Sequence, residues 1–315
     1  MQQNFTTKIS IIIPVYNEVE SLPELNEKLL KTMATLPFNY EIIFIDDGST
    51  DGSFEVLKEL KRSNNKIKIM KFRRNFGQTA AIDAGFKKAR GELILTMDAD
   101  LQNDPADIPK LLEKINNGYD VICGWRKNRQ DPFSKKIISR CANLLRKIIL
   151  CDKIHDAGCT LKIYRKICLQ NLNLYGEMHR FIPSILEWRG FKISEVIVNH
   201  CPRKYGQTKY SLTRTIRGLL DMIVVKFWMR YSVKPMHIFG GLGIICEFLG
   251  LISLAYLFYI KIFLKRGISD RPLLILAVLL IILGGQFLVF GLISDILIKI
   301  YYKEDHYYEI EYQEE

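Results

Sequence analysis

Two acidic pairs in this 315-residue chain stand where they could do chemistry. Asp98 and Asp100 form a D-x-D pattern that begins directly after an apolar run, GELILTM, at residues 91–97. Mg²⁺ and Mn²⁺ prefer oxygen ligands, and Mg²⁺ is commonly held by one or two carboxylates together with substrate phosphates. Gln102 could add a carbonyl oxygen. The pattern predicts a divalent-metal site with Asp98 and Asp100 as catalytic carboxylates.

A second acidic cluster, DDGSTDG at residues 46–52, follows another apolar run, YEIIFI at 40–45. Carboxylates accept hydrogen bonds from ribose hydroxyls or a base N–H, and glycine lets the backbone come close to a ligand. A plain turn is the alternative, because Asp, Gly and Ser favour turns on their own. The cluster does not match G-x-G-x-x-G, which disfavours a dinucleotide-binding fold. The segment PVYNE, residues 14–18, ends a third apolar run and is expected to lie beside this cluster.

Positive charge is in excess, with 45 Lys and Arg against 34 Asp and Glu and a net charge of +11. Nucleic acid, anionic lipid and phosphorylated small molecules are all compatible with that balance. Basic residues gather in GWRKNR and PRKYGQTKY, and arginine suits bidentate phosphate contacts. No aromatic-interleaved nucleic-acid motif accompanies them, so phosphate recognition is favoured over nucleic acid. The seven cysteines include no C-x-x-C pair, which disfavours a disulfide framework and a zinc ribbon.

The first part of the chain must position these groups, and it alternates β-branched runs with helical spacing. Such alternation implies βαβ units and a mostly parallel sheet. In these sheets ligands bind beyond the carboxyl ends of the strands, which is where both acidic clusters fall. The expected strands are 8–15, 40–45, 66–72, 91–97 and 119–124, and the expected helices are 21–36, 51–62, 77–89 and 105–116.

The last part of the chain changes character. Residues 238–260 carry one charge, Glu247, and residues 272–294 carry none. At a rise of ~1.5 Å per residue each stretch reaches about 34 Å, enough for a hydrocarbon core of ~30 Å. We therefore predict a two-helix transmembrane hairpin within residues 237–298. Glu247 is costly there unless it faces a helix partner or a cavity.

Residues 206–236 form a basic amphipathic stretch with aromatic residues near its end, which predicts helices lying in a membrane interface. A helix packed on the enzyme core is the alternative. The basic excess and the lack of a signal peptide predict that the domain at 1–205 and the acidic tail at 299–315 are cytoplasmic; in a bacterium the membrane would be the plasma or inner membrane. Homo-oligomerisation is left open by glycines that permit close helix contact, namely Gly240, Gly241, Gly243, Gly284 and Gly285.

Seven segments, in order, resemble glycosyltransferase family 2 and, within it, the polyprenyl-phosphate glycosyltransferases of the dolichol-phosphate mannose synthase and undecaprenyl-phosphate type. They are SIIIPVYNEVESLPEL, EIIFIDDGSTDGS, RNFGQTAAIDAGFKKARGELILTMDADLQNDPADIP, GYDVICGWRKNRQD, HDAGCTLKIYR, GEMHRFIP and VNHCPRKYGQTKYS. The resemblance implies an α/β GT-A fold, Rossmann-like with a mostly parallel sheet. It also implies a divalent cation (Mg²⁺ or Mn²⁺), a nucleotide-sugar donor and a polyprenyl-phosphate acceptor at a lipid bilayer.

Carried over by motif, the resemblance implies three sets of site residues. The nucleotide-sugar pocket would be lined by Pro14, Tyr16, Glu18, Asp46, Asp47, Gln78 and Asp98. The metal would be held by Asp98, Asp100 and Gln102. The acceptor phosphate would be bound by Arg126, Arg140, Arg203 and Lys209, and Asp156 of HDAGC would be a catalytic orienter or assisting base.

The chain has GEMHRF where processive synthases of this family have Q-x-x-R-W, which favours transfer of a single sugar. It also has HDAGC where the related pattern is HDYGC, so an aromatic contact is missing there. The expected reaction is inverting transfer with UDP-glucose as donor, although GDP-mannose, UDP-N-acetylglucosamine and a modified arabinose donor stay open. The alternatives are a non-phosphate lipid or glycan acceptor, a catalytically silent membrane scaffold, and a nucleotidyltransferase, which leaves two membrane spans unexplained.

Overall fold

The computed structural model describes residues 9–127, 146–147, 149–150, 152, 154–172, 174, 176–202, 204–205, 212–231, 234–268 and 272–301. The chain divides into two compact units, Met1–Val225 and Lys226–Glu315. Helix α7 (Leu212–Tyr231) contains the point of division.

One mixed seven-stranded sheet forms the centre of the first unit, in the order β3-β2-β1-β4-β6-β5-β7. Every neighbouring pair is parallel except those made by β6, which is antiparallel to both β4 and β5. The mostly parallel sheet predicted from the sequence is confirmed, and β6 is a strand that the sequence pattern did not predict. The strands are β1 (Ile9–Val15), β2 (Tyr40–Asp46), β3 (Ile67–Lys71), β4 (Leu93–Thr96), β5 (Val121–Trp125), β6 (Lys162–Arg165) and β7 (Ile193–Ile197).

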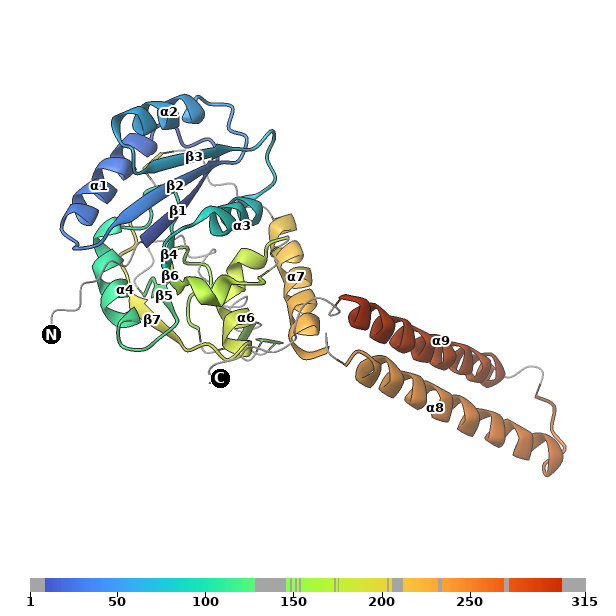
Figure 1. The fold of residues 1–315 in the computed structure, drawn as a ribbon. Coiled ribbons are helices and arrows are strands. Elements are labelled where there is room, and N and C mark those ends of the chain that lie inside the picture. The colour runs from blue at the N-terminus through green and yellow to red at the C-terminus, as the bar shows by residue number, and fades with distance from the viewer. Residues whose placement is uncertain are drawn as a thin grey trace. The chain divides into compact units, whose positions relative to one another are not determined.

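Helices cover both faces of this sheet. Ile11 and Ile13 of β1 belong to one core with apolar side chains of α1, α2 and α4. Ile12 points to the opposite face, where it lies against Gly85 of α3. Figure 1 accordingly shows α1 and α4 along one side of the strands and α3 along the other. The helices are α1 (Leu22–Ala34), α2 (Ser53–Ser63), α3 (Gln78–Lys88), α4 (Ile108–Ile115) and α6 (Ile182–Trp188), with 3₁₀ turns η1 (Pro105–Asp107), η2 (Lys166–Leu169) and η3 (Met178–Arg180).

The helix expected over residues 105–116 begins instead as the 3₁₀ turn η1 and becomes α-helical at Ile108. Asp104 caps η1 by accepting a hydrogen bond from the N–H of Ala106, and Pro105 occupies the first position, where a missing N–H costs nothing. This arrangement starts the helix immediately after the D-x-D turn and therefore fixes the chain that leaves the site.

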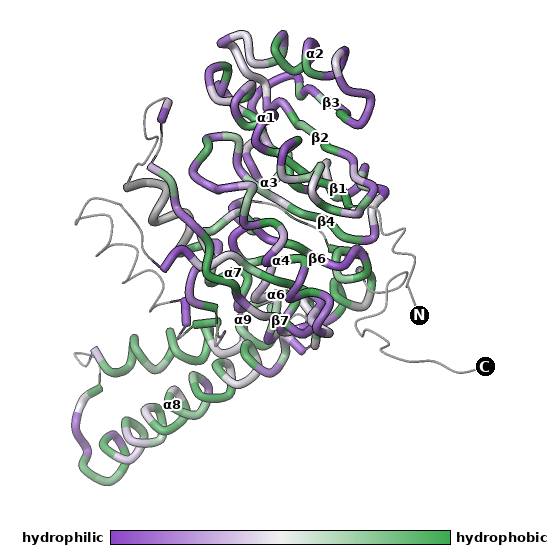
Figure 2. The backbone as a smooth tube through the Cα atoms, turned by 90° about the vertical axis from the view of Figure 1, so that its left-hand side faces the viewer, coloured by the Kyte–Doolittle hydropathy of each residue, from purple (hydrophilic) through white to green (hydrophobic). Residues whose placement is uncertain are grey.

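The second unit contains α8 (Met236–Ile262) and α9 (Pro272–Tyr301), which pack against each other. Both are long and apolar enough to cross a membrane, and both extend beyond the expected spans 238–260 and 272–294. Figure 2 shows hydrophobic residues along most of α8. A Cβ built on Gly243 would lie 3.0 Å from the carbonyl oxygen of Gly284, so glycine permits the close approach of the two helices.

Glu247, the one charge in the first span, lies at this helix contact. A Cβ built on Gly284 would lie 2.8 Å from its Cγ. Its side chain therefore packs over the Gly284–Gly285 step of α9, a helix partner of the kind that a charged residue in a span requires. Gly243 and Gly284 lie at the contact between α8 and α9 of the same chain. Homo-oligomerisation stays a prediction.

Candidate active site

The candidate site lies at the carboxyl ends of β1, β2, β4 and β5, which all point the same way because β6 is the one reversed strand in the described part of the chain. Glu18 follows β1, Asp46 ends β2, Asp98 follows β4 and Arg126 follows β5. This is the edge at which an open α/β sheet binds its ligands.

Asp98 is the most electrostatically perturbed of these residues. Its Oδ1 accepts a hydrogen bond from Nε2 of Gln78, the first residue of α3, at 2.7 Å. Burial raises the pKa of Asp98 to about 7, and the nearby charge of Asp100 adds to the increase; a hydrogen bond with Thr160 and the charge of Arg126 act in the opposite direction. Negative charge is thus concentrated here beyond what the neighbouring cation compensates.

The turn that carries Asp100 is sharply bent. Leu101 has a φ of 61°, in the left-handed region that a bulky side chain rarely adopts. Asp100 Oδ1 accepts the N–H of Gln102 at 3.1 Å, and the carbonyl oxygen of Gln102 accepts the N–H of Cys201 at 3.1 Å. The backbone of Gln102 thus ties the D-x-D turn to the chain after β7, while its role as a metal ligand stays a prediction.

The Asp98–Asp100 pair fits a divalent cation, because a cation would offset the like charges that raise the pKa of Asp98. Among the described residues, no three His, Cys, Asp or Glu side chains are placed so that they could together hold a metal ion. The described part of the chain therefore supplies only a part of a coordination sphere. Mg²⁺ bound by one or two carboxylates keeps waters and substrate phosphates as its remaining ligands.

The segment after β1 lies directly against the acidic cluster after β2, as the sequence predicted. The N–H of Asn17 donates to Ser49 Oγ at 3.0 Å, and the N–H of Glu18 donates to Ser53 Oγ at 2.9 Å. The charge of Glu18 also acts to raise the pKa of Asp98, so the two carboxylates lie within electrostatic range of each other. Tyr16 is 36% exposed at the same edge.

Asp46 and Pro14 lie inside the sheet end rather than on its rim. Pro14 pairs in register with Ile45 within the β1–β2 ladder. Asp46 is fully buried and its Oδ1 accepts the N–H of Ser49 at 2.9 Å. Gly48 follows with a φ of 73°, and a Cβ there would lie 2.5 Å from the carbonyl carbon of Arg74, so the turn requires glycine.

Asp47 holds the loop that leads into α3. Its two carboxylate oxygens accept the N–H groups of Phe76 at 2.7 Å and Gly77 at 2.9 Å. Burial raises the pKa of Asp47, while these two hydrogen bonds act to lower it. The carboxylate therefore positions the start of α3, and with it Gln78, whose amide contacts Asp98.

Arg126 and Asp156 form a buried, two-point ion pair. The Arg126 Nε donates to Asp156 Oδ2 at 2.7 Å and Nη2 donates to Oδ1 at 3.0 Å; the Arg126 backbone N–H also approaches Oδ2 at 3.3 Å. Their side chains are 12% and 6% exposed. This geometry makes Asp156 the orienting partner of Arg126, since both of its carboxylate oxygens are bonded to that guanidinium.

The ion pair needs space that Gly158 provides. A Cβ built on Gly158 would lie 3.3 Å from Arg126 Nη2 and 3.6 Å from Asp156 Oδ1. Among the described residues, the Arg126 guanidinium donates to Asp156 through Nε and Nη2, and its Nη1 donates to none of them. The guanidinium is therefore fixed on one edge by Asp156 and has donors left for an anionic ligand on the other.

Several residues that contact these groups carry no role in the sequence-based predictions. Asn103 Nδ2 donates to Thr160 Oγ1 at 2.7 Å, and Thr160 in turn hydrogen-bonds Asp98. Thr79, beside Gln78, pairs with the buried ring of His179 at 2.7 Å across 100 residues of sequence. Thr160 and His179 stand in the HDAGCT and GEMHRF segments, so these contacts fall within two of the motifs, although the sequence did not identify them.

Three of the predicted acceptor residues, Arg140, Arg203 and Lys209, lie outside the described residues. Lys204, next to one of them, forms an ion pair with Glu24 of α1 at 2.7 Å. The assignment of these three basic residues to the acceptor phosphate therefore stays a prediction.

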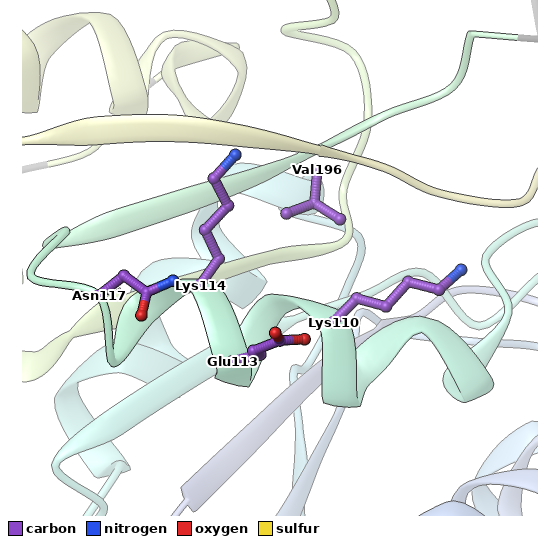
Figure 3. A pocket seen from close by; sticks show the side chains of 5 residues that line it. All are labelled: Lys110, Glu113, Lys114, Asn117 and Val196. Carbon is purple, nitrogen blue, oxygen red and sulfur yellow. The ribbon is translucent and has the colours of Figure 1, made fainter.

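A shallow cavity of about 250 Å³ lies elsewhere, between α4 and β7. It is lined by Lys110, Glu113, Lys114, Asn117 and Val196, which Figure 3 shows. Lys110 is already bonded to Asp107, and Lys114 donates to the carbonyl oxygen of Glu195. None of its lining residues is among the predicted site residues.

Comparison with known proteins identifies the family to which this chain belongs. The model of glycosyl transferase family 2 matches residues 10–172. The dodecaprenyl-phosphate galacturonate synthase of Rhizobium johnstonii is 41% identical over 303 residues, covering 95% of this chain and 90% of the relative. The chain belongs to glycosyltransferase family 2. The undecaprenyl-phosphate 4-deoxy-4-formamido-L-arabinose transferase of Proteus mirabilis, a further relative, is 34% identical, covering 93% of this chain and 89% of the relative.

Solved structures support the same fold. Mannosyl-3-phosphoglycerate synthase from Rubrobacter xylanophilus superposes with a TM-score of 0.57 at 14% identity, covering 70% of this chain and 74% of that one. Glucosyl-3-phosphoglycerate synthase from Mycobacterium tuberculosis, solved with Mn²⁺ and UDP-glucose, superposes with a TM-score of 0.54 at 14% identity, covering 70% and 79%. The first unit of this family 2 glycosyltransferase has a GT-A-like fold, as the sequence predicted, and the protein is an enzyme of sugar transfer.

Proposed function

We propose that this glycosyltransferase moves one sugar from a nucleotide-sugar donor to the phosphate of a polyprenyl phosphate at a membrane surface. The observation that carries the proposal is the extent of the match to relatives whose names state a polyprenyl-phosphate product or substrate. The match covers 95% and 93% of this chain, a share that includes part or all of the two apolar helices as well as the catalytic unit.

The site suits that reaction. Asp98 and Asp100 would hold Mg²⁺ or Mn²⁺, which offsets charge on the departing nucleoside diphosphate. Tyr16, Glu18 and the cluster at 46–52 line the neighbouring edge, where the nucleotide would lie. Arg126, oriented by Asp156, offers donors to the acceptor phosphate from the β5 side.

The acceptor phosphate needs little help from a base. The second pKa of a phosphate monoester is ~6, so the nucleophile is already largely dianionic at pH 7. Positioning and charge stabilisation are then the main contributions of the protein. Asp156, with both oxygens bonded to Arg126, acts as an orienter in this scheme, and a single displacement inverts the anomeric centre.

The membrane-facing part of the proposal rests on α7 and the hairpin. On α7, Leu220 is 57% exposed, Ile223 53% and Trp228 39%, whereas Met222 and Val225 are buried. An apolar outer face with Trp and basic neighbours suits a helix in the headgroup region. We propose a catalytic domain over 1–205, interface helices over 206–236, two spans within 237–298 and a tail over 299–315, with the catalytic domain and tail cytoplasmic because the juxtamembrane charge is positive.

The donor sugar is the open part of the proposal. The relatives are named for galacturonate and 4-deoxy-4-formamido-L-arabinose, and they give no support to the UDP-glucose donor expected from the sequence. We propose an activated acidic or amino-modified sugar of these classes.

The test is incubation of the full-length protein in detergent with undecaprenyl phosphate, Mg²⁺ or Mn²⁺, and one donor at a time, followed by mass spectrometry of the lipid. The donors are UDP-galacturonate, a UDP-4-formamido-arabinose, UDP-glucose, UDP-N-acetylglucosamine and GDP-mannose. The proposal predicts a polyprenyl-phosphate product carrying a single sugar. Sugar transfer only to diacylglycerol or a glycan offered in parallel reactions, or no transfer from any donor, would contradict it.

A further inference from the structure

A third carboxylate, Glu195 of the edge strand β7, lies behind the Arg126–Asp156 pair. Its Oε1 accepts the backbone N–H of His155 at 2.9 Å and that of Asp156 at 3.2 Å. Its Oε2 pairs with His155 Nδ1 at 2.6 Å. The Glu195 side chain is 13% exposed, so its contacts to the His155 and Asp156 backbone are largely shielded from water.

The imidazole of His155 is fixed from a second side. It stacks on the indole of Trp125, with ring centroids 4.5 Å apart and planes 19° apart. Trp125 ends β5 and immediately precedes Arg126. Glu195 therefore fixes His155 and Asp156, and Asp156 is itself a member of the ion pair with Arg126.

These contacts form a chain from Glu195 to Arg126, the residue proposed to bind the acceptor phosphate. Glu195 fixes the backbone of Asp156, the Asp156 carboxylate fixes two nitrogens of Arg126, and the remaining nitrogen of Arg126 has donors for an anion. A displacement of the loop by about 1 Å would move the guanidinium by a similar distance, and errors of that size can cost about 10²-fold in rate.

We propose that Glu195 is a positioning residue for acceptor use, which acts through Asp156 on Arg126. The inference rests on the proposed function, because it assigns Arg126 to the lipid phosphate. The backbone contacts make the length of the side chain decisive and its charge secondary, since two peptide N–H groups need an oxygen at a fixed distance.

The test uses the full-length enzyme, the donor found in the panel above and undecaprenyl phosphate. The Glu195→Leu variant should lower kcat/KM for the lipid phosphate by about 10–100-fold while the Kd of the nucleoside diphosphate stays within about twofold of wild type. Glu195→Gln retains an oxygen at the same distance and should stay within about fivefold of wild type. Glu195→Asp retains the charge, but its side chain is shorter by one methylene. It should therefore have the lower acceptor kcat/KM of the two conservative variants.

Asp120→Leu is the matched control. Its Oδ2 also accepts a backbone N–H across the β5–β7 pair, that of Lys192 at 2.8 Å, but it does so where these strands begin, whereas Arg126 follows the end of β5. It should leave acceptor kinetics unchanged even if it lowers the melting temperature as much as Glu195→Leu does. Should Glu195→Leu fail to fold, the ranking of Glu195→Gln above Glu195→Asp still decides.

A double-mutant comparison separates positioning from general stability. In an Arg126→Ala background, Glu195→Leu should cost less than about threefold in acceptor kcat/KM, because the group that it positions is gone. Three results would each overturn this inference without touching the proposed function. The Glu195 variants could all transfer sugar with wild-type kinetics, or the losses in the double mutant could be additive. The third is a higher acceptor kcat/KM for Glu195→Asp than for Glu195→Gln. Absence of any transfer by the wild type would overturn the proposed function and the inference together.

Discussion

The two ends of one sheet treat carboxylates in opposite ways. At the amino end of β2, Glu41 accepts hydrogen bonds from Ser10 Oγ at 2.6 Å and Arg90 N at 2.7 Å, and its Oε2 lies 2.5 Å from Lys68 Nζ. Burial acts to raise the pKa of Glu41, but the bonds to Lys68, Ser10 and Arg90 outweigh it and lower the pKa to about 2. At the carboxyl end of β4, burial and Asp100 raise the pKa of Asp98 to about 7.

The difference separates a carboxylate that stabilises the fold from one that is prepared for a ligand. A carboxylate whose pKa is lowered by its protein partners stabilises the fold when it is ionised, whereas like charges placed together cost stability unless a cation or substrate joins them. One sheet therefore has an amino end where protein groups compensate the buried carboxylate, and a carboxyl end where the acidic pair is not fully compensated. The predictions below test that contrast.

The largest effect is expected at Asp98. Asp98→Asn should lower transfer by about 10³-fold, because it removes a carboxylate that would hold the cation offsetting charge on the leaving diphosphate. The melting temperature of the free enzyme should not fall, since the variant relieves repulsion from Asp100. Activity and thermal unfolding are measured on the same samples. Asp104→Asn, which alters only the cap of η1, is the control and should retain near-normal transfer.

The next largest effect is expected at Arg126. Arg126→Ala should lower kcat/KM for the lipid phosphate by about 10²-fold and leave donor binding nearly unchanged. Arg126→Lys should recover little, because an ammonium cannot reproduce the two-point pair with Asp156. The control is Arg165→Lys at the other end of the sheet, where the guanidinium binds the carbonyl oxygens of Tyr119 and Ile115. Equal losses in donor and acceptor binding would place Arg126 outside the acceptor site.

Glu41 should show the reverse pattern, a loss of stability without a loss of chemistry. Its pKa of about 2 lies below the ordinary 4.5, so its contribution is complete above pH 4.5 and is lost as the pH falls toward 2. Glu41→Gln should cost about 2 kcal/mol near pH 7, allowing for the exposure of Lys68. The gap from wild type should narrow in melting curves recorded toward pH 3. A constant gap across that range would contradict the assignment.

The smallest effect is expected at Gly158. Gly158→Ala places a methyl group 3.3 Å from Arg126 Nη2 and should raise KM for the lipid phosphate by several-fold with little change in kcat. Steady-state kinetics with each substrate varied in turn measures it. Unchanged acceptor KM would show that the guanidinium has room to move and that Gly158 does not shape the acceptor side of the site.

How much of this organisation is predictable from sequence depends on the distance between partners. Asp46, Asp98 and Asp100 follow apolar runs directly, so strand ends locate them without any knowledge of the fold. Glu195 meets His155 across 40 residues, and its own strand shows nothing that distinguishes it from a solvent-facing glutamate. Strand β6 escaped prediction for a related reason: Lys162–Arg165 is four residues long, two of them charged, and it becomes a strand only between β4 and β5.

The central claim is that the nucleophile is a lipid phosphate held beside the Asp98–Asp100 pair. Phosphorus NMR of the acceptor during turnover tests it directly. The wild type, supplied with donor and a divalent cation, should convert the monoester signal of undecaprenyl phosphate into a phosphodiester signal, and Asp98→Asn should leave the monoester signal in place. Consumption of the donor with an unaltered monoester signal in the wild type would contradict the account.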